Sequence, residues 1–153
     1  MQVSAPYCQY KKTNFKIYIV ILLIAAVYFA YDGYLNKNFI KKHTTIDQPD
    51  STLAFNKKSP PFFVAGAVIL AVWFWMVKDK KLVADDEALV FSEKDKIPYD
   101  SIESINKTNY DSKGLFIVEY KLPNGQKSQR EVSSNTYDNL APILELLVSK
   151  ITG

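Results

Sequence analysis

The run Ser59–Val77, SPPFFVAGAVILAVWFWMV, is the longest stretch of the chain without a charged residue. It holds 19 residues between Lys58 and Lys78, and a helix needs about 20 apolar residues to cross the roughly 30 Å hydrocarbon core of a bilayer. Pro60 and Pro61 stand at its start, where the first amides of a helix have no helical acceptor. The pattern predicts a transmembrane helix over residues 60–78.

The far end of this run carries the residues that are typical of a membrane–water boundary. Aromatic side chains at headgroup depth, followed by lysines, mark such boundaries. The predicted interface residues here are Trp73, Trp75, Lys78, Lys80 and Lys81.

A second uncharged run, Ile17–Tyr31, covers 15 residues and would extend only about 22 Å as a helix. Because the Lys16 side chain can reach back to the interface, the helix can begin earlier, and we expect a transmembrane helix over residues 13–35. Lys16 at one end and Tyr28 and Tyr31 at the other are predicted to lie at the two interfaces.

Two other interpretations of these runs are core helices of a soluble protein and, for the first run, a cleaved signal peptide. Core helices of a soluble protein usually keep a polar stripe, and neither run has one. A cleaved signal peptide would need small residues before the cut, but Ile or Tyr occupies that position at the plausible sites after Ala25. An uncleaved membrane hairpin is therefore the prediction.

A hairpin of two spans places both termini on the same side of a membrane. Six lysines flank the spans on the terminal side and five lie in the connection at residues 36–59, so the positive-inside rule gives a narrow preference for cytoplasmic termini. Residues 34–42 could continue the first helix or lie on the bilayer surface, and the rest of the connection, with Pro49, Asp50 and Ser51, is predicted to be a loop. Residues 1–12 are expected to form a tail.

The charge of the chain is divided unevenly. Residues 1–77 hold eight Lys and three Asp, a net +5, whereas residues 82–153 hold eight Lys and Arg and twelve Asp and Glu, a net −4. The basic residues thus belong to the membrane flanks, and we expect no nucleic-acid partner.

Residues 81–153 predict a small α+β domain of four or five antiparallel strands and one helix. Strands are expected at residues 88–91 and 115–122 and, after the turn at Pro123-Asn124-Gly125, at residues 126–133. A helix capped by Ser134 or Thr136 should follow, and Pro142 would then end its first turn or kink it. The apolar stripe of that helix is Leu140, Ile143, Leu144, Leu147 and Ile151.

This order of antiparallel strands followed by one amphipathic helix resembles a pleckstrin-homology-like domain. The stretches that carry the likeness are residues 82–91, the Ile97-Pro98-Tyr99-Asp100-Ser101-Ile102 phrase and the closing helix. The full fold has seven strands. The arrangement is similar to small bacterial membrane proteins in which transmembrane helices precede such a domain, which implies a location in the bacterial inner membrane.

No motif in the chain predicts catalysis. The single histidine, His43, and the single cysteine, Cys8, lie far apart in the sequence, and no glycine-rich phosphate loop is present. Cys8 precedes a span, where palmitoylation is possible, but an inert thiol is the favoured interpretation. Asp32 is expected near the interface rather than in a proton path. We expect no enzyme activity, cofactor, metal or small-molecule substrate.

Three functions are compatible with these features. The first is an accessory or scaffolding subunit of a larger membrane complex, with Gly66 and Ala67 permitting close helix packing. The second is a membrane-tethered binding module whose domain recognises a peptide or a lipid headgroup. The third, a transport component, would require oligomerisation because two spans without buried charge form no pathway. We favour the first.

Overall fold

A computed structural model describes residues 2–152 and divides the chain into two compact units, which are treated separately. One unit contains residues 1–12 together with residues 76–153, and the other contains residues 13–75. Each connection between them runs through a helix.

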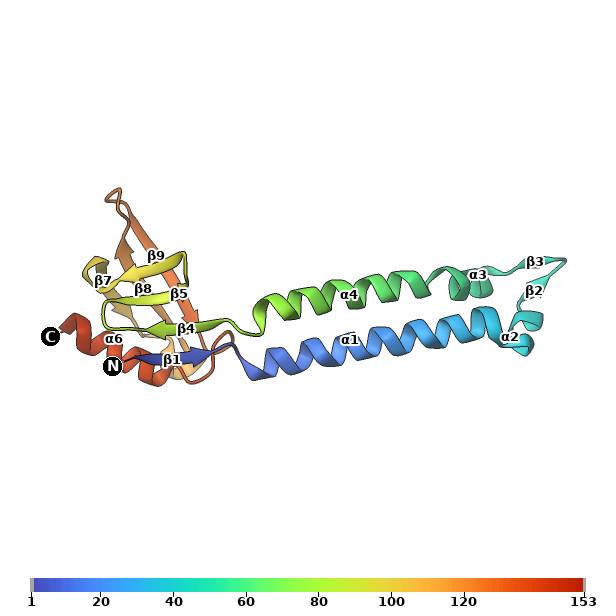
Figure 1. Ribbon diagram of the computed structural model, residues 1–153, viewed down its shortest axis with the longest axis horizontal. Helices are drawn as coiled ribbons and strands as arrows, with labels where there is room; N and C mark the ends of the chain where they lie inside the picture. Colours follow the sequence, from blue (N-terminus) through green and yellow to red (C-terminus); the bar gives the residue numbers. More distant parts are fainter. Residues whose placement is uncertain (1, 153) are drawn as a thin grey trace. The chain divides into compact units, whose positions relative to one another are not determined.

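The helical unit is an antiparallel pair that is longer than the sequence predicts (Figure 1). Helix α1 (Gln9–Ala30) passes into a π-helical turn, η1 (Tyr31–Leu35), and α4 (Pro60–Val77) is preceded by α3 (Ser51–Lys58). Ser59 keeps a helical backbone, so α3 and α4 form one 27-residue helix, Ser51–Val77, with both prolines inside it.

The connection between the two helices is ordered, and the expected loop around Asp50 is wrong. Short helix α2 (Lys37–Lys42) leads into a two-stranded hairpin, β2 (Thr44–Thr45) and β3 (Gln48–Pro49), and then into α3. The Asp50 side chain caps α3 by accepting the Leu53 N–H at 2.8 Å, and such caps favour a helix start. Pro49 is typical of a loop, and for that reason the sequence does not reveal this cap.

The second unit contains antiparallel strands and a closing helix, as the sequence predicts. Its described strands number seven, rather than the four or five expected, and they form two sheets. One sheet has the order β1-β4-β5-β6, formed by Val3–Pro6, Lys81–Ala84, Ala88–Ser92 and Asp95–Pro98. The other has the order β7-β8-β9, formed by Ile102–Asn106, Leu115–Lys121 and Lys127–Ser133. The short helices are η2 (Tyr99–Ser101) and α5 (Tyr110–Lys113), and α6 (Ala141–Thr152) follows the second sheet.

Residues 3–6, expected to belong to a tail, form the first strand of this unit. Strand β1 pairs with β4 in the register Val3↔Ala84 to Pro6↔Lys81, and Ala5 is fully buried. The next residues are tied down as well, because Cys8 is buried and its N–H donates to the Thr136 carbonyl at 2.9 Å. The helical segment is therefore inserted between two neighbouring strands of one sheet.

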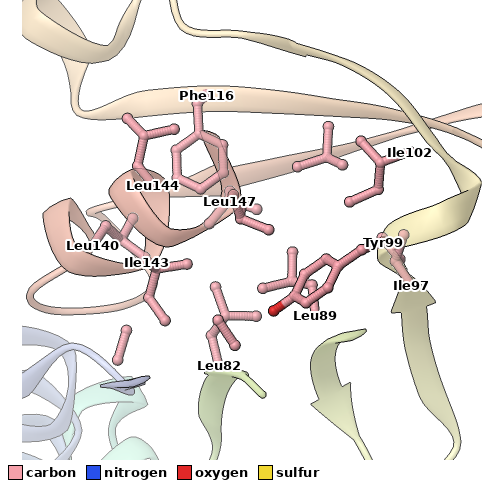
Figure 2. Close-up of a cluster of buried hydrophobic side chains, with 14 residues drawn as sticks. Leu82, Leu89, Ile97, Tyr99, Ile102, Phe116, Leu140, Ile143, Leu144 and Leu147 are labelled. Atoms are coloured by element: carbon pink, nitrogen blue, oxygen red, sulfur yellow. The ribbon is translucent and has the colours of Figure 1, made fainter. Parts of the chain in front are cut away.

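The core of the sheet unit lies between the two sheets and α6 (Figure 2). Most of the predicted stripe is buried there, with Ile143 and Leu147 fully inaccessible, in one cluster with Phe116 and Val118 of β8, whereas Ile151 is only partly buried. The helix begins only at Ala141, so neither Ser134 nor Thr136 caps it. Pro142 lies in its first turn, where its missing N–H leaves no helical acceptor unpaired.

Candidate functional site

The helical unit exposes an unusual amount of apolar surface. In each long helix the most apolar window of 18 residues is largely exposed. Only 6% of this window is buried in the first helix, and 17% in the second. Both helices are long and apolar enough, by length and composition, to cross a membrane. The large apolar side chains that remain more than half exposed include Ile24, Val27, Tyr28, Ile69, Trp73 and Trp75.

Three small residues, Ala26, Gly66 and Ala67, lie where the two helices meet. Ala26 of α1 and Ala67 of α4 are buried, and an added side-chain carbon at Gly66 would lie 3.5 Å from Leu22. Gly66 and Ala67, expected to permit packing with another subunit, are thus used between the two helices of this chain. Farther along the pair, the Phe29 ring stacks on Phe63 with their centroids 5.4 Å apart.

The predicted interface residues of the helical unit are exposed. Tyr28 and Tyr31 lie near the end of the first helix, and Trp73 and Trp75 lie in the last turns of α4. The Lys16 ammonium lies 5.7 Å from the centre of the Phe74 ring, so its charge rests on an aromatic face. These contacts place the start of α1 beside the end of α4.

The remaining predicted interface residues belong to the sheet unit. Lys78 pairs with Asp79 at 3.2 Å, and Lys80 and Lys81 are exposed. The backbone N–H of Tyr7 donates to the Lys80 carbonyl at 2.9 Å, and this hydrogen bond continues the β1–β4 ladder.

A polar cluster lies where η1 meets the junction of α3 and α4. Pro60 and Pro61 cannot donate to the carbonyls four residues earlier, those of Asn56 and Lys57. The Tyr34 hydroxyl donates to the Lys57 carbonyl at 2.8 Å and so replaces one missing bond. Gly33 is buried, and an added side-chain carbon there would lie 2.9 Å from the Asn56 carbonyl oxygen. The π turn and the paired prolines therefore fit each other.

Three side chains of this cluster, those of Asp32, Asn56 and Ser59, are buried although they are polar. Asp32 accepts a hydrogen bond from Asn36 Nδ2 at 2.9 Å. Ser59 is also buried, and its hydroxyl has no hydrogen-bond partner within residues 2–152. It lies one helical turn from both Phe55 and Phe63, the two residues whose rings contact Phe29.

A shallow apolar groove runs along the outer face of α1. Its volume is about 510 Å³, and its lining residues are Leu23, Ile24, Val27, Tyr28 and Tyr31. Of these residues, only Tyr28 and Tyr31 are predicted from the sequence to lie at an interface. The sequence does not distinguish Leu23, Ile24 and Val27 from the other apolar residues of the run, because it does not show which face of the helix α4 covers.

The sheet unit carries a second groove, of about 510 Å³, over β7, β8 and β9, and the lysine that lines it, Lys127, is already paired. Glu103 binds Lys121 at 2.8 Å and Lys127 at 2.9 Å, and these hydrogen bonds hold the pKa of Glu103 below its ordinary value. Arg130 likewise binds Asp95 at 2.7 Å and covers the Phe91 ring. An incoming phosphate would have to displace these carboxylates.

Among the residues that the structure describes, no three His, Cys, Asp or Glu side chains are grouped so that they could hold a metal ion. No family model, curated protein or solved structure matches the chain.

Proposed function

We propose that this chain is a non-catalytic membrane protein, an accessory or scaffolding subunit that docks on a larger membrane complex through its helical hairpin. The groove of α1 is the observation that carries the proposal. It is apolar, its lining includes two tyrosines, and we propose that a transmembrane helix of a partner packs on it. Packing of side chains, rather than a hydrophobic force, drives such association in lipid.

Low burial supports the membrane location. A core helix of a soluble protein is mostly buried, whereas the buried shares here are 6% and 17%. The pairing of β1 with β4 requires residues 3–6 and 81–84 to be in one compartment. An even number of spans between them meets that requirement. In this proposal the helices form a hairpin in the bacterial inner membrane, with both termini on the cytoplasmic side.

The sheet unit is proposed to be a pleckstrin-homology-like domain. Support comes from the strand count, since β1, β4 to β6 and β7 to β9 make seven antiparallel strands within residues 2–152, followed by α6. In this interpretation the membrane hairpin is inserted after the first strand of the domain. Recognition of an anionic headgroup by β7 to β9 is disfavoured, because Glu103 already engages the nearby lysines.

Co-purification in mild detergent tests the proposal, with two matched variants. Val27→Trp would fill the α1 groove, whereas Val68→Trp adds the same side chain at an exposed position of α4 that does not line the groove. We expect stoichiometric membrane partners with the wild type and with Val68→Trp, and their loss with Val27→Trp. A wild-type chain that purifies alone would overturn the proposal.

A further inference from the structure

Strand β9 ends its sheet and leaves one side of its backbone unpaired. The sheet order is β7-β8-β9, so β9 has a neighbouring strand on one side only. The Ser134 N–H donates to the Gly114 carbonyl at 2.9 Å, and the Leu122 N–H donates to the Gln126 carbonyl at 2.9 Å. Hydrogen-bonded and non-hydrogen-bonded pairs alternate along an antiparallel ladder. The even-numbered residues of β9 therefore bond to β8.

The odd-numbered residues of β9 direct their backbone groups away from β8. The Ser133 carbonyl is used within the unit, because it accepts the Tyr137 N–H at 3.0 Å. The backbone groups of Lys127, Gln129 and Glu131, here called the β9 edge, have no hydrogen-bond partner in the part of the chain that the structure describes. All three side chains are exposed. An edge of this kind can accept another strand.

The charges of β9 are complementary to those of β9 in a second copy of the chain. Two copies related by a two-fold axis would pair antiparallel, with the axis passing between equivalent residues. An axis at Lys127, Arg130 or Glu131 would set like charges opposite each other. An axis at Ser128 would set Lys127 opposite Gln129. Only an axis at Gln129 sets Lys127 opposite Glu131, and the symmetry makes that pair twice.

The register centred on Gln129 also suits the backbone. It pairs Lys127 with Glu131 and Gln129 with its own copy, and all of these residues direct N–H and C=O outwards, so about six hydrogen bonds can form. Within residues 2–152, Glu131 has no ion-pair partner. Lys127 binds Glu103 at 2.9 Å, but its side chain remains 77% exposed, and an ammonium group has donors to spare for a second carboxylate.

We propose that two copies of this chain pair through the β9 edge, antiparallel about an axis at Gln129, so that the β7-β8-β9 sheets of the two copies join. Charged residues on an edge strand often prevent pairing. That protection depends on repulsion, whereas here opposite charges meet, and such cross-strand pairs are stabilising. The inference goes beyond the proposed function and does not depend on it.

Cross-linking in native membranes tests the pairing on the full-length chain, before detergent can separate a small contact. Gln129→Cys should give a dimer of this chain with a short bis-maleimide, because both copies of residue 129 lie at the axis. Ser112→Cys, at an exposed position of α5, should give none. The buried Cys8 should add little background.

Charge reversal separates self-pairing from other contacts. In the Gln129→Cys chain, Glu131→Lys alone and Lys127→Glu alone should each lower the dimer yield about tenfold or more, because like charges then meet twice. Co-expression of these two variants with different tags should restore a mixed dimer, because the lysines of one copy then meet the glutamates of the other. Glu93→Lys, the same charge change at an exposed residue outside β9, should leave the yield unchanged.

Several results would contradict pairing through β9. They are no adduct of Gln129→Cys, an adduct with a different protein, a dimer that survives Glu131→Lys, and a failure of the two variants to form the mixed dimer. If other membrane proteins co-purify but the dimer is absent, only the pairing fails. If the dimer forms and no other protein co-purifies, the pairing stands and the proposed function fails.

Discussion

Gly33 shows how one residue determines the fit of two helices. Paired prolines usually weaken a helix by removing donors, yet here they lie inside the 27-residue helix. Close approach by η1 replaces one lost hydrogen bond, since the Tyr34 hydroxyl donates to the Lys57 carbonyl. Gly33 permits this approach, because its backbone lies close to that of Asn56. Only a residue without a side chain allows that distance.

We predict that Gly33→Ala destabilises the helix pair. The new carbon would lie 2.9 Å from backbone atoms of Asn56, which cannot move as a side chain can, and overpacking of this kind costs about 1–3 kcal/mol. Gly66→Ala is the matched control, because its nearest neighbour is a leucine side chain at 3.5 Å. Thermal unfolding in detergent should show a lower midpoint for Gly33→Ala alone. Equal midpoints would refute the close contact.

Tyr99 makes the sheet unit sensitive to alkali. Burial, and then the charges of Asp85 and Asp86, raise the pKa of Tyr99 to about 12, and its hydroxyl donates to the Asp85 carbonyl at 2.8 Å. An unfolded tyrosine ionises near pH 10. The stabilisation is therefore complete below pH 10 and is lost as the pH rises towards 12.

The measurement is the free energy of unfolding of the full chain between pH 9 and 12, about the range in which tyrosine and lysine titrate. Tyr99→Phe should be less stable at pH 9 but should lose less stability over this range than the wild type. Identical pH profiles for the two proteins would show that Tyr99 is not the group responsible.

Among the helices and strands, the sequence predicts those whose formation depends on residues close together in the chain. The two apolar helices, the β8–β9 hairpin with its Asn124-Gly125 turn and the stripe of α6 all have strong periodicity or turn chemistry. Strand β1 has four residues, one of them proline, and its partner lies 75 residues or more away along the chain. No short-range signal could reveal that pairing. The groove on α1 was equally hidden, because it depends on which helix face α4 covers.

Strand β1 gives the next prediction. Ala5→Asp would place a carboxylate at a fully buried site of the core and should strongly destabilise the sheet unit, by about 3 kcal/mol or more. Ser4→Asp, one residue away on the exposed face, should be nearly neutral. Hydrogen exchange at the amides of β4 should accelerate only with Ala5→Asp. Unchanged exchange would mean that residues 3–6 are a tail after all.

For the whole molecule, the insertion of the helices between β1 and β4 has a consequence for topology. If the helices span a membrane, β1 and the rest of the sheet unit share one side and the β2–β3 hairpin lies on the other. We predict that Ser4→Cys and Lys94→Cys react with an impermeant maleimide from the same side of sealed vesicles. Ile46→Cys should react only from the opposite side. Cys8 is buried and should contribute little background. Labelling of all three positions from one side would exclude a spanning hairpin.

The mass of the native particle tests the central claim most directly. The chain should be expressed at its natural level, extracted in mild detergent and weighed by native mass spectrometry. We predict a particle well above the 17.4 kDa of this chain, containing other membrane proteins in fixed ratio. A particle that consists of this chain alone, as a monomer or a homo-oligomer, would contradict the account of an accessory subunit.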